Sequence, residues 1–152
     1  LQMAAAVAAI ANDGVMMRPH IVAERISSDG NSVLIAQTPI GQPISAEAAQ
    51  TLTELMARAM ETRMKQATVP GYRIAGKSGT AQIPVSGVYD PDDIIASFVG
   101  FGPLPDPQVL ILVKLDRPAI DPLLRWGSQT AAPLFQRIAA RLFVLLQIPP
   151  TE

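Results

Sequence analysis

The sequence contains no cysteine, which excludes disulfide bonds, catalytic thiolates and cysteine-ligated zinc or iron–sulfur sites. Its only histidine, His20, has no acidic partner nearby, and this favours a structural or surface role. No carboxylate–histidine cluster predicts a metal site, and nothing in the sequence calls for a cofactor. The net charge is −1 and no basic stripe interleaves with aromatic residues, so nucleic acid is not an expected partner.

Long hydrophobic runs are also lacking. The apolar opening segment, residues 1–11, is too short to span a bilayer, and no basic region precedes it. We expect it to form a buried helix that ends at Asn12-Asp13-Gly14, a turn signal. Because the chain starts with a leucine inside this helix, we expect it to be cut from a larger domain.

Hydrophobic residues make up 49% of the 152 residues, enough for the core of one compact domain or of a large piece of one. Short apolar runs at 21–22 and 33–35 flank an Asp-Gly pair, which predicts a hairpin. Residues 38–43 read as a linker. Ser45 is a good N-cap for a helix that runs to about Lys65.

Three strands are predicted next, at 72–83, 94–101 and 109–115, with a polar loop between the first two. Short links between successive strands imply an antiparallel meander. A last helix is predicted from Ser128, with Pro133 in its first turn. The order of elements gives an α+β fold. The expected apolar face of the last helix consists of Leu134, Phe135, Ile138, Ala139, Leu142, Leu145 and Leu146.

The most informative segment is residues 76–82, Gly-Lys-Ser-Gly-Thr-Ala-Gln, on the first predicted strand. Side chains two apart share a face, so Ser78 and Thr80 point together while Lys77 and Gly79 point to the other side. On an edge strand, free N–H groups and hydroxyls can bind an extended peptide that ends in a carboxylate. Glycine at 79 leaves room where a Cβ would intrude.

Two other interpretations of this segment stay open from its residues alone. It can be a polar surface loop. It can also be a degenerate phosphate loop, although Pro84 and Gly87 prevent the helix that a phosphate loop requires.

Lys77-Ser78-Gly79 resembles the Lys-Thr/Ser-Gly element of penicillin-binding proteins and serine β-lactamases. The flanking residues are similar to the class B penicillin-binding proteins over nearly the whole chain. Ser97 departs from the tryptophan that many members have, and Gly127-Ser128-Gln129 replaces a glycine-rich turn, for which we expect a packing role. The segments that carry the resemblance are residues 1–4, 9–14, 18–22, 75–82, 96–103 and 131–135.

The resemblance implies a penicillin-binding protein/serine β-lactamase-like fold, of which this chain supplies three strands of an antiparallel sheet flanked by helices. It implies peptidoglycan cross-linking through an acyl-enzyme serine, with stem peptides and β-lactams as ligands. Lys77 and Thr80 would be catalytic, Lys77 by its charge and Thr80 through an oxyanion-binding N–H. The substrate-binding residues would be Ser78, Gly79, Thr80, Ala81 and Gln82.

The nucleophile of this family lies in Ser-x-x-Lys, and no serine of this chain has a lysine three residues later. Ser-x-Asn is absent as well. We therefore interpret residues 1–152 as the C-terminal portion of one transpeptidase domain, inactive without the missing N-terminal half. The strand at 109–115 would then expose an apolar edge, which predicts association with that half or a homodimer.

The family further implies the extracytoplasmic face of the bacterial membrane, with an anchor outside this chain. Whether the protein acts in cell division, elongation or sporulation stays open. So do three alternatives: a serine β-lactamase, a penicillin-sensing domain and a non-catalytic penicillin-binding-like module.

Overall fold

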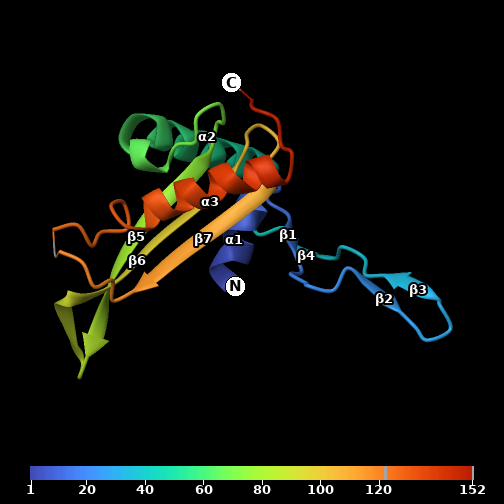
Figure 1. Cartoon of the computed structure of the whole chain (residues 1–152), viewed down its shortest axis with the longest axis horizontal. Helices are drawn as coiled ribbons and strands as arrows, with labels where there is room; N and C mark the ends of the chain where they lie inside the picture. The colour runs from blue at the N-terminus through green and yellow to red at the C-terminus, as the bar shows by residue number, and fades with distance from the viewer. Residues whose placement is uncertain (122, 152) are drawn as a thin grey trace. The chain divides into compact units, whose positions relative to one another are not determined.

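The computed structural model describes residues 1–121 and 123–151 (Figure 1). The chain divides into two compact units, Leu1–Gln50 and Thr51–Glu152. Within the described residues, no helix is both long and apolar enough to cross a membrane.

The first unit opens with α1, Gln2–Ala11. The helix ends as predicted, because the Gly14 N–H donates to the Ala9 carbonyl at 2.8 Å. Gly14 has φ +85°, and a Cβ there would lie 2.2 Å from the Ile44 carbonyl oxygen, so only glycine fits this turn. The expectation that the whole segment is buried is wrong, since its buried residues are Val7 and Ala9 while Met3 is 65% exposed.

Two small antiparallel pairs follow in this unit. The predicted hairpin is confirmed as β2 (Glu24–Ile26) and β3 (Ser32–Leu34), although its first strand starts later than residues 21–22. In its turn, Asp29 accepts hydrogen bonds from Ser27 and Asn31, and the Ser27 hydroxyl is the main cause that lowers the Asp29 pKa. The supposed linker contains β4 (Pro39–Gly41), which pairs with β1 (Met16–Met17).

Helix α2, Ala46–Arg63, begins where Ser45 predicts it. The Ser45 hydroxyl accepts a hydrogen bond from the Ala48 N–H at 3.2 Å, as an N-cap does. A short 3-10 helix, η1 (Lys65–Ala67), follows. Farther on, Arg73 joins Glu54 at 2.7 Å and Glu61 at 2.9 Å, which ties the start of the sheet to α2 within the second unit.

The second unit is built on a three-stranded antiparallel sheet of order β5-β6-β7, the predicted meander. The strands are β5 (Ala75–Val85), β6 (Val88–Gly102) and β7 (Val109–Asp116). The prediction of a polar loop between the first two strands is wrong. The chain instead continues as a hairpin beyond a register shift, because Gln82 pairs with Ile94 while Ile83 pairs with Asp90.

Helix α3, Ala131–Leu145, lies across the sheet (Figure 1). The Phe98 and Phe135 rings pack at a centroid distance of 4.8 Å, and Tyr72 and Phe143 at 4.5 Å. The helix begins three residues after the predicted Ser128. Its predicted face is partly wrong, because Phe143 is buried whereas Leu145 is 65% exposed. The fully buried residues of α3 are Ala131, Ala132, Phe135, Ala139 and Phe143.

Candidate functional site

The Lys-Ser-Gly-Thr segment lies on β5, and among the described strands β5 pairs only with β6. The condition for binding an extended peptide, a position at the edge of the sheet, is therefore met among the described strands. In an antiparallel pair, alternate N–H groups face away from the partner, so part of the β5 backbone is open to a ligand.

The register fixes the two faces of this edge. Ser78 stands opposite Phe98, and Thr80 opposite Ala96. Residues opposite each other share a face, and Phe98 packs under α3, so both hydroxyl residues belong to the face that α3 covers. Lys77 and Gly79 belong to the other face, as the alternation predicts.

On that other face, Lys77 is exposed, and its amine donates to the Ser78 carbonyl oxygen at 2.8 Å. A Cβ added to Gly79 would lie 2.6 Å from the Ser97 hydroxyl oxygen on the neighbouring strand. Glycine thus lets Ser97 lie directly beside the lysine motif.

The Thr80 hydroxyl has a partner far along the chain. The Gly127 N–H donates to the Thr80 Oγ1 at 3.1 Å. Gly127 is buried against backbone, since a Cβ there would lie 2.3 Å from the Gly79 oxygen and 2.4 Å from the Ser97 oxygen. Carbonyl oxygens of a paired sheet cannot rotate away, so this position requires glycine.

A network of hydrogen bonds fixes the turn that carries Gly127. The Trp126 carbonyl accepts from the Gln129 N–H at 2.8 Å and from the Thr130 N–H at 3.0 Å. The Gly127 carbonyl accepts from Ala132, in the first turn of α3, at 2.9 Å. The buried start of α3 therefore holds the turn against the sheet.

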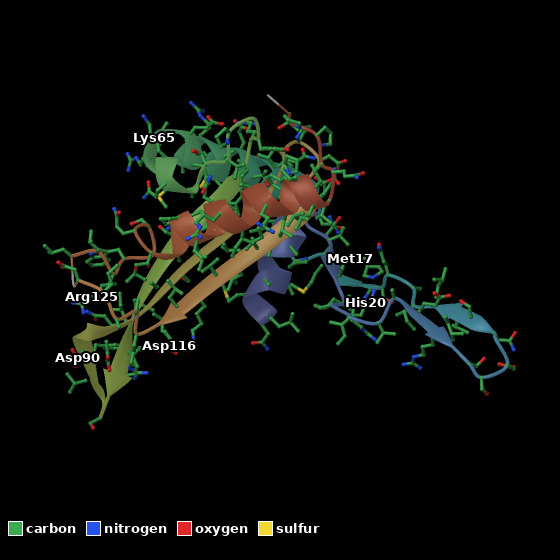
Figure 2. All side chains as sticks on the ribbon, viewed as in Figure 1. Met17, His20, Lys65, Asp90, Asp116 and Arg125 are labelled. Atoms are coloured by element: carbon green, nitrogen blue, oxygen red, sulfur yellow. The ribbon has the colours of Figure 1, made fainter. Side chains whose placement is uncertain are left out.

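A cavity of about 300 Å³ lies at the end of the motif, lined by Thr80, Gln82, Ile94, Arg125 and Trp126. Figure 2 shows Arg125, before α3, and Asp90, on the hairpin extension, at the same end of the sheet. Trp126 is 55% exposed and offers an aromatic surface beside the motif. The cavity thus combines a hydroxyl, an amide, a guanidinium and an indole.

Sequence reasoning missed Gly127 as a partner of the motif and did not single out Arg125 or Trp126. It gave the Gly127 turn a packing role, but the structure adds a hydrogen bond to Thr80. No local pattern reveals a contact across 47 positions of sequence. The only available signal was a glycine shortly before the last predicted helix.

The remaining candidates lie elsewhere. His20 is exposed, and its Nδ1 lies 3.3 Å from the Arg18 carbonyl oxygen (Figure 2). Within residues 1–121 and 123–151, no group of acidic and histidine side chains is arranged to hold a metal ion.

Comparison with protein families matches residues 1–140 to the penicillin-binding protein transpeptidase domain. PbpB of Mycolicibacterium smegmatis is 38% identical over 98% of this chain, and stage V sporulation protein D of Bacillus subtilis is 34% identical over 100% of this chain. The chain spans about a quarter of each relative, 24% in both cases.

Among solved structures, penicillin-binding protein 3 of Mycobacterium tuberculosis superposes with a TM-score of 0.84 and 34% identity, over 99% of this chain and 36% of that one. The same protein has been solved in complex with aztreonam and with ampicillin. The transpeptidase domain of penicillin-binding protein 3 from Burkholderia pseudomallei gives a TM-score of 0.82 and 31% identity, over 99% of this chain and 43% of that one.

Proposed function

This chain belongs to the penicillin-binding protein transpeptidase domain family, and on that premise we propose that the protein containing it cross-links peptidoglycan by D-Ala-D-Ala transpeptidation. A serine attacks the carbonyl of the penultimate D-alanine, the terminal D-alanine leaves, and an amine of a neighbouring stem peptide takes the acyl group. β-Lactams acylate the same serine. The observation that carries the proposal is the Lys-Ser-Gly-Thr edge of β5, which among the described strands pairs on one side only, with β6.

Lys77 and Thr80 are the proposed catalytic residues. The exposed amine of Lys77 supplies positive charge beside the reacting serine and assists proton transfer. The Thr80 N–H is one donor of the oxyanion hole, where a backbone dipole stabilises charge that develops in the transition state.

The remaining motif residues bind substrate. The hydroxyls of Ser78 and Thr80 hold the terminal carboxylate, and Gly79 leaves room. Ala81 and Gln82 extend the edge along which a stem peptide adds as a further strand. Support comes from the edge position of β5 and from the cavity that Thr80 and Gln82 line.

The proposed nucleophile belongs to a segment that this sequence does not contain, since the chain has no Ser-x-x-Lys. That segment is the first expected partner of the chain, and together they would form one transpeptidase domain. The family supports a location on the extracytoplasmic face of the bacterial cytoplasmic membrane.

The other outer strand, β7, supports the proposal of association. Among the described strands it pairs only with β6, and Leu112 on it is 39% exposed. Unpaired N–H and C=O groups along an apolar strand favour pairing with another chain. In the absence of its upstream partner, we expect this chain to form a homodimer along that edge, which sedimentation at rising concentration measures.

The test of function compares two proteins, this chain and a longer one that extends upstream. Each is treated with benzylpenicillin, and intact mass is measured together with the rate of β-lactam hydrolysis. We expect the longer protein to gain one acyl mass that persists, and this chain to gain none.

Each outcome separates the candidate functions. Acylation followed by rapid release would favour a β-lactamase, and no acylation of either protein would favour a non-catalytic module. Acylation of the short chain alone would place a nucleophile within it, against the proposal.

A further inference from the structure

The hydrogen bond between Gly127 and Thr80 joins the motif to a turn 47 positions later in the chain. We propose that Gly127 is a positioning residue, which orients the Thr80 hydroxyl so that its hydrogen points to the ligand carboxylate. This inference rests on the proposed function, because it assumes that Thr80 binds a carboxylate. It adds a residue and a physical role that the motif does not contain.

A threonine hydroxyl has one hydrogen to donate and two lone pairs that accept. The Gly127 N–H occupies a lone pair, at 3.1 Å. The single hydrogen of Thr80 is therefore not used in this contact and stays available to an incoming anion. Accepting one bond also polarises the hydroxyl and strengthens it as a donor.

The position of the Gly127 N–H is fixed from two sides. On the sheet side, Gly127 lies so close to the carbonyl oxygens of Gly79 and Ser97 that a Cβ would stand 2.3 and 2.4 Å from them. On the other side, its own carbonyl accepts from Ala132 at the buried start of α3. The donor is thus in place before any ligand arrives, and orienting the hydroxyl adds little entropy cost to binding.

The turn also has a second anchor, because the Gln66 side-chain amide donates to the Ser128 carbonyl at 2.8 Å. Since η1 and the first turn of α3 both hold this loop, a change at Thr80 is not expected to displace it. A Thr80→Val variant therefore isolates the hydroxyl, whereas Gly127→Ala moves the donor.

The first experiment measures amide hydrogen exchange in the longer protein that contains this chain. In Thr80→Val, we expect the Gly127 N–H to exchange roughly tenfold faster or more, since it loses its acceptor. The Gln129 N–H, which donates to Trp126, should keep its rate and reports the integrity of the turn. Thr80→Ser, which retains a hydroxyl, should restore slow exchange at Gly127. An unchanged Gly127 rate in Thr80→Val overturns the inference.

The second experiment is a double-mutant cycle on the second-order rate constant of acylation by benzylpenicillin. A hydrogen bond to a charged group contributes about 1.5–3 kcal/mol, so Thr80→Val should slow acylation by roughly 10- to 100-fold. Gly127→Ala should slow it by about tenfold, as expected for a misdirected hydroxyl. In the Thr80→Val background, Gly127→Ala should slow acylation by clearly less than it does in the wild-type background, because the part of its effect that passes through the hydroxyl is already lost. Losses that multiply overturn the inference.

Two controls complete the design. Gln129→Ala changes an exposed side chain in the same turn, and Thr62→Val removes a hydroxyl from α2; both should leave the rate unchanged. With the methyl ester of benzylpenicillin, which lacks the carboxylate charge, the effect of Gly127→Ala should shrink; an equal effect on both ligands counts against the inference. If the longer protein is not acylated at all, the proposed function fails, while the exchange rates still decide whether Thr80 holds Gly127.

Discussion

The two outer strands of the sheet differ in chemistry although both pair only with β6 among the described strands. Strand β5 carries a lysine, two hydroxyl residues and two glycines, while β7 reads Val-Leu-Ile-Leu-Val before its first charge. An apolar run of this kind is typical of a strand buried on both faces. Polar side chains at an edge are typical of a strand that stays open.

This difference in side-chain chemistry suggests a different kind of binding partner for each unpaired edge. The edge of β5 is suited to a small ligand, because its side chains can bind an anion and its register leaves Lys77 exposed. The edge of β7 is suited to protein, because Leu112 and its neighbours gain from burial. Four predictions test this comparison.

The largest expected effect is on the stability of the fold, through β6, the central strand with which both β5 and β7 pair. Phe98 is fully buried between β6 and α3, and replacing it with alanine should lower the free energy of unfolding by about 3–5 kcal/mol. Denaturant titration of the longer protein measures this loss. Val88→Ala, on an exposed part of the same strand, should change stability by less than about 0.5 kcal/mol. Similar losses for both variants would mean that the aromatic core does not support the sheet.

The second prediction compares the lysines of the two outer strands. In the longer protein, Lys77→Gln should lower the acylation rate constant by about a hundredfold or more, since the proposed proton-transfer group is lost. Lys114, on β7, lies on the same face of the sheet as Lys77 and forms an ion pair with Asp116 at 3.2 Å. Lys114→Gln should therefore leave the rate nearly unchanged. Equal effects of the two variants would remove the distinction between the edges.

The third prediction concerns the apolar edge. Leu112→Lys should weaken self-association of this chain by about tenfold or more, because a charge is placed where the partner strand would bury a leucine. Sedimentation velocity over a range of concentrations measures the change. Val144→Lys is the matched control, since Val144 is already 74% exposed on α3. If the wild-type chain itself stays monomeric over this range, the proposed homodimer is rejected.

The smallest expected effect lies away from both edges, where Arg73 joins Glu54 and Glu61. Hydrogen bonding to Arg73 is the main cause that lowers the Glu54 pKa. The pair therefore stabilises the fold above the ordinary carboxyl pKa, near 4.3, and this contribution is lost as pH falls through the lowered value. Both carboxylates are about half exposed, so Arg73→Gln should lower Tm by less than about 4 °C at neutral pH.

The measurement is the Tm difference between wild type and Arg73→Gln as a function of pH. The difference should vanish at low pH, where Glu54 is protonated in both proteins. If the Tm difference persists unchanged to low pH, its cause is the lost packing of the Arg73 side-chain stem and not the ion pairs.

Local chemistry made some elements predictable. The Ser45 cap, the Asp-Gly turn and the alternation around Lys77 depend on residues within a few positions of one another, and the structure has each of them. Element ends were less predictable. Strand β6 begins at Val88, because cross-strand pairing beyond the register shift extends the hairpin through residues that read as a polar loop.

The sequence alone determined the α+β order, the antiparallel meander and the alternation of side chains around Lys77, because spacing and short links limit how such strands can pair. Only the tertiary structure decided that Phe143 rather than Leu145 faces the core, and that Gly127 reaches Thr80. These depend on how α3 lies across the sheet. Packing of this kind joins residues far apart in the chain, and no local pattern records it.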